Sequence, residues 1–228
     1  MTYEKIIKGE FLTRPNRFIA QVLVDGNEET VHVKNTGRCR ELLTEKAEVF
    51  LAVSSNPLRK TKYDLVAVKK GNKLINMDSQ IPNDVAEEWL RSSNLFSRDA
   101  VIRREVNCGK SRFDFYIEDG ERKIFLEVKG VTLENGGIAM FPDAPTERGV
   151  KHISELISLK KEGYEAYILF VIQMEEVTGF MPNDITHKAF GDKLREAEEA
   201  GVEIFIKNCK VTENAIEIKG DIPFLHSL

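Results

Sequence analysis

The first part of the chain alternates short apolar runs with turn-forming residues. Five such segments predict short strands; they lie at 4–13, 17–26, 29–35, 47–55 and 63–78. The Asp-Gly-Asn sequence at 25–27 predicts a hairpin turn, and residues 38–43 predict a short helix after the third strand. This pattern predicts a small closed β-barrel of the OB type, although an SH3-like barrel would produce a similar one.

After Pro82 the pattern changes to a mixture of helical and strand periods. Helices are expected at 84–93, 146–161 and 184–200, and strands at 100–106, 165–173, 202–209 and in the tail 211–223, with a hairpin at 111–133. The uninterrupted apolar run at 166–172 predicts a strand that is covered on both faces. We therefore predict two domains: a barrel over 1–82, and a mixed sheet flanked by helices over 83–228.

The composition narrows the class of protein. The longest apolar run, 166–172, is far shorter than the roughly 20 residues that cross a bilayer, and the N-terminal segment has no apolar signal core. The three cysteines are odd in number and far apart, as expected of reduced thiols. These features predict a cytoplasmic protein that has no membrane partner.

Charge is distributed unevenly over the 228 residues. Residues 1–82 hold 14 Lys and Arg against 10 Asp and Glu, whereas residues 83–228 hold 19 against 27. A positive module joined to an acidic one suits an anion-binding platform beside a site that supplies its own carboxylates. Solubility alone would also account for the acidic part.

The apolar hairpin of the second domain carries the most informative polar residues. With Asp119 and Gly120 as a two-residue turn, paired residue numbers sum to 239. Alternation then places Asp114, Glu127 and Lys129 on one face, with the two carboxylates as diagonal neighbours roughly 7 Å apart. The apolar residues of the hairpin are expected on the other face: Phe113, Phe115, Ile117, Ile124, Leu126 and Val128.

This trio suits phosphodiester hydrolysis. Mg²⁺ or Mn²⁺ is usually held by one or two carboxylates plus a substrate phosphate, so Asp114 and Glu127 are the predicted metal ligands. Lys129 would offset the negative charge that grows in the transition state. The spacing is loose, however, and a Glu-x-Lys sequence on a half-exposed strand is also typical of a solvated surface.

Several blocks of the sequence resemble the sugar fermentation stimulation protein A family. They are RPNRF (14–18), HVKNTGRCRELL (32–43), SRFDFYIE (111–118), FLEVKGVTL (125–133) and MFPDAPTERGVKHISEL (140–156). The resemblance implies an OB-type domain followed by a restriction-endonuclease-like, PD-(D/E)xK domain, with Asp114, Glu127 and Lys129 at the nuclease motif positions. It also implies non-specific DNA binding and a regulatory link to sugar (maltose) use.

Further candidates lie on two predicted helices. Members of the nuclease superfamily often add an acidic residue from the helix before the sheet, and Glu88 is preferred over Glu87 for that catalytic role, although both could be ordinary surface charges. On the helix at 146–161, Arg148 and Lys151 could bind a DNA phosphate near the N-terminus. His152 belongs to the same polar face and is expected to be structural rather than catalytic.

In the barrel, basic residues are interleaved with amides and one aromatic residue. The predicted DNA-binding residues are Arg14, Asn16, Arg17, Lys34, Asn35, Arg38 and Arg40. Phe18 is expected in the core rather than as a stacking platform. A salt-bridged surface would present the same arginines.

Three functions stay open on the sequence alone. The favoured one is a DNA-binding protein with a Mg²⁺-dependent nuclease site. A non-catalytic DNA-binding regulator that retains the nuclease fold is the alternative, and a role in RNA processing is a third, because nothing in the sequence reads the 2′-hydroxyl.

Overall fold

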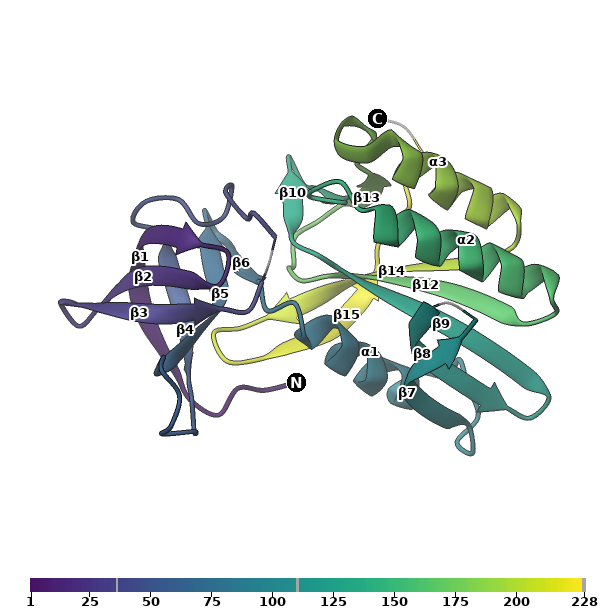
Figure 1. Ribbon diagram of the computed structural model, residues 1–228, viewed down its shortest axis with the longest axis horizontal. Coiled ribbons are helices and arrows are strands. Elements are labelled where there is room, and N and C mark those ends of the chain that lie inside the picture. Colours follow the sequence, from purple (N-terminus) through teal and green to yellow (C-terminus); the bar gives the residue numbers. More distant parts are fainter. Residues whose placement is uncertain (36, 110, 227–228) are drawn as a thin grey trace.

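The computed structural model describes residues 1–35, 37–109 and 111–226, and Figure 1 shows a barrel beside a larger α/β domain. The barrel strands are β1 (Ile6–Asn16), β2 (Ile19–Val24), β3 (Asn27–Val33), β4 (Glu48–Val53), β5 (Tyr63–Lys70) and β6 (Lys73–Asn76). Their order is β3-β2-β1-β4-β5-β6, and an additional parallel pairing of β3 with β5 closes the barrel. The expected OB-type domain is confirmed.

The second domain is built on a six-stranded sheet of order β15-β14-β12-β9-β8-β7. Its strands are β7 (Val101–Cys108), β8 (Ser111–Asp119), β9 (Arg122–Val131), β12 (Glu165–Ile172), β14 (Glu203–Val211) and β15 (Ile216–Asp221). A small sheet contains β10 (Leu133–Asn135), β11 (Ile138–Phe141) and β13 (Gly179–Pro182). The helices are α1 (Ile81–Ser92), α2 (Glu147–Lys161) and α3 (Asp184–Glu199).

Strand β12 explains why the large sheet is covered on both faces. It runs parallel to both β9 and β14, and its alternate residues enter two different cores. Ile168 and Phe170 join the core under α2 and α3, whereas Leu169 joins the core under α1. The predicted central strand, covered by helices on both sides, is therefore confirmed. Within the described part of the chain, no helix is long and apolar enough to span a membrane.

Two predicted helices differ from the structure. Residues 38–43 form a single hydrogen-bonded turn, in which the Leu43 amide donates to the Cys39 carbonyl at 2.9 Å. Cys39 has a φ of 45°, which a right-handed helix cannot accommodate. The helix expected at 84–93 begins earlier, at Ile81, with Pro82 in its first turn, where its missing N–H costs no hydrogen bond.

The hairpin between β8 and β9 has a different register from the predicted one. It turns at Gly120 and Glu121, so Asp119 pairs with Arg122 and paired numbers sum to 241. A shift of two residues keeps side chains on their faces, but regular pairing ends at Phe115 and Leu126. Just beyond, β8 departs from the ladder.

This departure places one phenylalanine on an unexpected face. Phe113 packs against Phe125, with ring centroids 5.3 Å apart, and belongs to the core under α2, whereas Phe115 belongs to the core under α1. The expectation that both lie opposite Asp114 and Glu127 is therefore wrong for Phe113. The cause is local, because the Asp114 side chain accepts the Val128 amide at 2.8 Å and replaces a ladder bond there.

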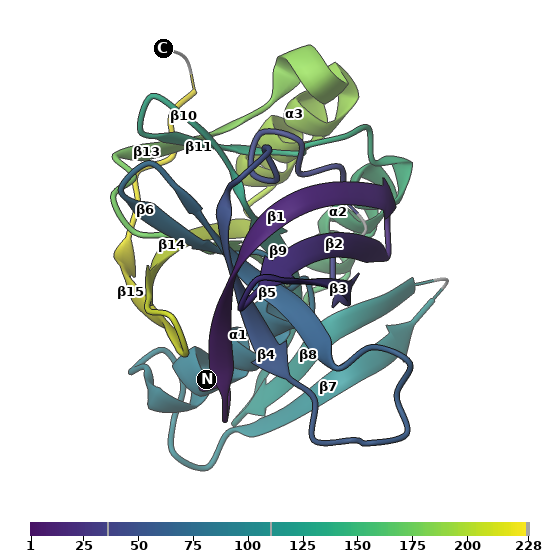
Figure 2. The same cartoon turned by 90° about the vertical axis from the view of Figure 1, so that its left-hand side faces the viewer.

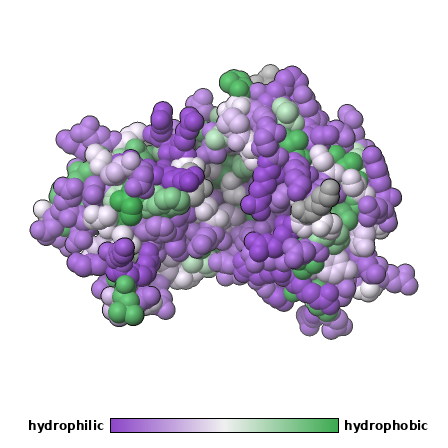
Figure 3. Space-filling model, viewed as in Figure 1, coloured by the Kyte–Doolittle hydropathy of each residue, from purple (hydrophilic) through white to green (hydrophobic). Residues whose placement is uncertain are grey.

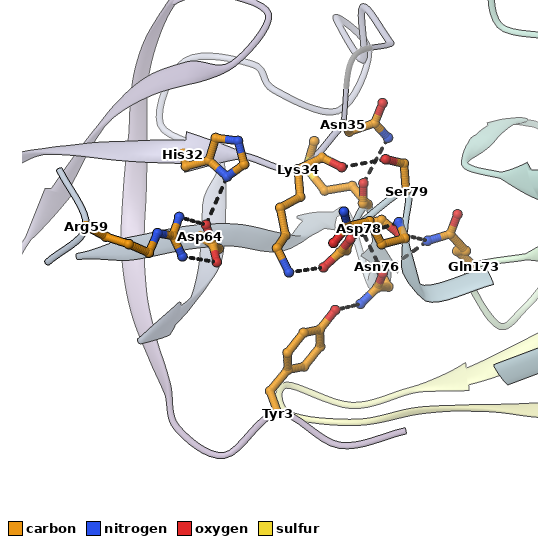
Figure 4. A network of polar contacts seen from close by, with 12 residues as sticks. Tyr3, His32, Lys34, Asn35, Arg59, Asp64, Asn76, Asp78, Ser79 and Gln173 are labelled. Carbon is orange, nitrogen blue, oxygen red and sulfur yellow. Dashed lines mark hydrogen bonds and ion pairs between the residues drawn. The ribbon is translucent and has the colours of Figure 1, made fainter. Parts of the chain in front are cut away.

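A buried polar network joins the two domains (Figure 4). Gln173, which follows β12, donates at 3.0 Å both to the Asn76 side chain and to the Asp78 carbonyl of the barrel. Asn76 also donates to the Tyr3 hydroxyl, and Lys34 pairs with the buried Asp78 at 3.1 Å. Figure 2 shows the barrel in front of the second domain, with the N-terminal end of the chain running down toward α1. These hydrogen bonds hold the barrel in one orientation.

Candidate active site

The hairpin carboxylates lie where three elements of the second domain meet. Glu127 and Lys129 are on β9, and Asp114 is on β8 at the point where the two strands separate. His152 reaches the site from α2, and Asn83 reaches it from α1. The sequence-based expectation that Asp114, Glu127 and Lys129 gather in one place agrees with this arrangement.

Glu127 is the centre of the site and is only 3% exposed. Its Oε1 accepts hydrogen bonds from Lys129 Nζ and His152 Nδ1, each at 2.5 Å. Its Oε2 is also buried, and among the described residues it has no hydrogen-bond partner. Burial alone would raise the pKa of Glu127, but the His152 hydrogen bond and the Lys129 charge outweigh burial and lower the pKa. The carboxylate is therefore ionised, with one bare oxygen.

Asp114 occupies a contrasting environment. Oδ1 accepts from the Asn83 side chain and Oδ2 from the Val128 amide, both at 2.8 Å. Burial and the negative charge of Glu127 raise the pKa of Asp114, despite those hydrogen bonds and the attraction of Lys129. A cation between the two carboxylates would remove the repulsion that raises this pKa.

His152 contacts Glu127, although the sequence pattern predicts a structural role for it. It is 4% exposed, although it shares a helical face with exposed Arg148 and Lys151. Arg148 Nε donates to His152 Nε2 at 3.4 Å, so Nε2 is the acceptor nitrogen of the ring. Nδ1 then carries the hydrogen that is donated in the hydrogen bond to Glu127. His152 thereby fixes which oxygen of Glu127 is bare. The available signal was its position, one helical turn (four residues) before the buried Leu156 and next to the buried Ile153.

A cleft of about 360 Å³ opens between the barrel and the second domain, beside the end of β9. Gly130, directly after Lys129, lines it together with Gln173, and a Cβ at Gly130 would lie 2.6 Å from the Gln173 Oε1 and from Pro82. Only glycine lets β9 pass this close to α1. Asn35 and Gly37 line the barrel side of the cleft.

The predicted helix residues lie in different places. Glu88 is 56% exposed and forms an ion pair with the Met1 amino group at 2.7 Å. Asn83, five residues earlier on α1, does contact Asp114. Arg148 and Lys151 are exposed near the start of α2 and line a second pocket, of about 540 Å³, with His152. They lie beside the site, whereas Glu88 makes its contact at the N-terminus of the chain.

Four of the predicted DNA-binding residues hold the barrel's own loops. Arg14 donates to the carbonyls of Gly37, Arg38, Arg17 and Asn35 at 2.6–2.9 Å. Asn35 bonds the Met77 carbonyl and the Gly37 amide, and Asn16 accepts the Phe18 and Ile19 amides. Lys34 pairs with Asp78. The side chains left on the surface are those of Arg17, Arg38 and Arg40.

Phe18 does not lie in the core, so that expectation is wrong. It is 46% exposed, because it occupies the two-residue turn between β1 and β2, where Asn16 pairs with Ile19. The Arg17 guanidinium carbon lies 4.9 Å from the centroid of the Phe18 ring.

The side chains around Glu127 offer oxygen ligands of the kind that bind a divalent cation. Two carboxylates, one with a buried bare oxygen, supply the hard oxygen ligands that Mg²⁺ prefers. Over residues 1–35, 37–109 and 111–226, no cluster of three or more His, Cys, Asp or Glu side chains is arranged to hold a metal. The residues therefore fit a cation that takes its remaining ligands from water and phosphate, rather than one enclosed by protein.

Comparison with known proteins agrees with this architecture. The family model described as the SfsA N-terminal OB domain matches residues 12–77, and the one described as the sugar fermentation stimulation protein RE domain matches 80–215. Curated relatives named sugar fermentation stimulation protein homolog include one from Clostridium beijerinckii, 58% identical over 96% of this chain and 97% of the relative. Another, from Desulfitobacterium hafniense, is 58% identical over 95% of each.

A solved structure shows the same fold over its whole length. It is described as Pyrococcus furiosus SfsA in complex with Ca²⁺, with a TM-score of 0.86, 29% identity, and coverage of 99% of this chain and 98% of that one. With both family models matched in order and relatives that cover almost the full length, the chain belongs to the sugar fermentation stimulation protein family.

Proposed function

We propose that the chain binds DNA with little sequence preference and hydrolyses phosphodiester bonds at the site around Glu127 when Mg²⁺ or Mn²⁺ is present. The observation that carries the proposal is the buried Oε2 of the ionised Glu127, which has no hydrogen-bond partner in the described part of the chain and lies beside a second carboxylate. Burying such an oxygen without a partner is costly unless a ligand uses it. The Ca²⁺ named for the Pyrococcus furiosus relative is a hard cation of the same chemical class.

Asp114 and Glu127 would hold the cation, which when bound lowers the pKa of a coordinated water and neutralises phosphate charge. Lys129 has a side chain 16% exposed and is held against Glu127, so its ammonium is positioned near the reacting phosphate before substrate arrives. His152 keeps Oε1 occupied and Oε2 bare. Asn83 and the Val128 amide fix the orientation of Asp114.

Cleavage is tested with purified protein on single-stranded, double-stranded, branched and RNA substrates, with Mg²⁺, Mn²⁺ or EDTA. Wild type is expected to cut at least one substrate, and EDTA to stop it. Glu127→Gln should abolish cleavage yet bind DNA at least as well, because a negative charge near phosphate is lost. Lys129→Ala should keep metal binding and lose turnover. Equal activity of wild type and Glu127→Gln would place the cleavage elsewhere.

Binding is tested by its dependence on salt. The exposed Arg17 and Arg38 should each neutralise a phosphate, so the double alanine variant should flatten the log-log salt slope by about 1.8. A matched control removes two other exposed barrel charges, Lys60 and Lys69, and should leave the slope unchanged. An unaltered slope in the arginine variant would move the binding surface away from these residues.

A non-catalytic DNA-binding regulator of sugar use, retaining the nuclease fold, is the second candidate. It is favoured by the Lys129 and His152 contacts, which already offset the charge of Glu127, and by the lack of a third metal-ligating side chain among the described residues. DNA binding with no cleavage of any substrate by wild type, in either metal, would select this candidate.

A further inference from the structure

The turn between β1 and β2 presents an aromatic side chain to solvent in a fixed position. Phe18 is packed into neither hydrophobic core, and 46% of it is exposed. Most large apolar side chains of the barrel are buried, and the hydropathy surface in Figure 3 is mainly hydrophilic with scattered apolar residues. A ring left outside the core forgoes part of the stabilisation that full burial would supply.

The backbone around this ring is held unusually firmly for an exposed turn. Asn16 Oδ1 accepts the Phe18 amide at 2.9 Å and the Ile19 amide at 3.1 Å, and the Phe18 carbonyl accepts the Val33 amide at 2.7 Å. Arg14 donates to the Arg17 carbonyl at 2.8 Å. Four hydrogen bonds therefore position a residue whose side chain contributes nothing to the core, so the ring is pre-organised for contact.

The hydrogen bonds of Arg14 also bring positively charged residues close to the ring. One Arg14 guanidinium bonds both the Arg17 carbonyl and the Arg38 carbonyl, which brings the backbones of these two exposed arginines within reach of a single group. The Arg17 guanidinium also lies against the Phe18 ring, at 4.9 Å. Arg14 further bonds the carbonyls of Asn35 and Gly37, and these two residues line the cleft that contains Gly130.

We propose that Phe18 is a stacking platform for an unpaired DNA base, and that the protein therefore prefers single-stranded over fully paired DNA. This inference rests on the proposed DNA binding and adds the form of the substrate. Charge complementarity selects the occupant, because Arg17 and Arg38 suit phosphates whereas the ring suits the face of a base. In a duplex those faces are stacked on each other and unavailable to an aromatic side chain.

The test measures fluorescence anisotropy of labelled oligothymidylate, a duplex of equal length, and an abasic strand of equal length, all in EDTA. Phe18→Ala should weaken oligothymidylate binding about 5- to 100-fold and leave duplex and abasic binding within twofold of wild type. Phe18→Leu should behave like Phe18→Ala, whereas Phe18→Trp should retain affinity and show tryptophan quenching by oligothymidylate above the wild-type background. Leu58→Ala, which removes another exposed apolar side chain, 91% exposed in the β4–β5 loop, is the matched control.

The outcomes separate this inference from the proposed function. If wild type binds DNA but Phe18→Ala binds oligothymidylate as tightly as wild type does, the stacking inference fails and DNA binding stands. If Phe18→Leu restores wild-type affinity, the contact is apolar rather than stacking, and the inference also fails. If wild type binds none of the three ligands, the proposed function itself fails. Thermal melting of each variant should match wild type, because the side chain lies outside both cores.

Discussion

Arg14 is expected to act on stability rather than on phosphate, and replacing it with lysine tests this. Its guanidinium donates four hydrogen bonds to carbonyls, two in part-buried and two in exposed surroundings. A hydrogen bond from a charged donor contributes about 1.5–3 kcal/mol when buried and less at the surface. Lysine cannot span the four carbonyls, so we expect a loss of about 2 kcal/mol and a melting temperature roughly 4–8 °C lower.

The measurement is urea and thermal unfolding, followed by circular dichroism, together with the salt slope of DNA binding. Arg17→Lys is the matched control: it keeps the charge, and the exposed Arg17 guanidinium lies against the exposed Phe18 ring, so the free energy of unfolding should change by less than about 0.5 kcal/mol. The reasoning is refuted if Arg14→Lys is as stable as wild type. It is also refuted if DNA affinity falls in that variant while stability is retained.

Three other residues give predictions of different kinds. Burial and the charge of Glu127 raise the pKa of Asp114, so its ionised form destabilises the fold at pH 7. Asp114→Asn should therefore raise the free energy of unfolding by roughly 1 kcal/mol while abolishing cleavage. Lower stability of this variant in urea melts would contradict this. His152→Ala should weaken Mg²⁺ binding about 10- to 100-fold in calorimetry, because Glu127 loses the hydrogen-bond donor that orients it. An unchanged Mg²⁺ affinity would show that His152 does not orient Glu127 for metal binding. Burial alone would raise the pKa of Glu134, but hydrogen bonds from Lys73, the Gly137 amide and Lys70 lower the pKa to about 2. The ionised side chain therefore stabilises the fold at pH values above the unfolded pKa of about 4.5. Glu134→Gln should therefore cost about 2 kcal/mol at pH 7, and the difference from wild type should shrink as the pH falls from about 5 toward 2; a constant difference would contradict the linkage.

Much of the fold could be predicted because its strongest signals are local. Short apolar segments between turn residues mark β1 to β5, and the apolar run of β12 marks a strand buried on both faces. Thr146, the first residue of the helix predicted at 146–161, accepts the Gly149 amide and caps α2. The small sheet of β10, β11 and β13 was missed, because its strands are only three or four residues long and β11 pairs with β13 in parallel across a long connection.

The sequence predicts that Asp114, Glu127 and Lys129 lie close together, but not the contacts that His152 and Asn83 make with the two carboxylates. Alternation placed Asp114 with Glu127 whatever the register, since a shift of two residues leaves faces unchanged. The separation of β8 from β9 could not be foreseen, because it depends on a bond between Asp114 and the Val128 amide, fourteen residues away. Arg14 shows the same limit. Its place in a basic stretch predicts a DNA contact, because the carbonyls that it bonds lie up to 24 residues away in the sequence.

The energetics of the two carboxylates bear on which proposed function is correct. A fold selected only for binding DNA would gain stability and affinity from an amide at position 114, because Asp114 is partly buried and repelled by Glu127. Instead, Asn83 and the Val128 amide hold Asp114 in place, and His152 holds Glu127 with one oxygen bare. A divalent cation would relieve the repulsion and supply the missing partner together. This coupling supports the metal-dependent proposal and gives it a direct check: Mg²⁺ should raise the melting temperature of wild type but not of Asp114→Asn.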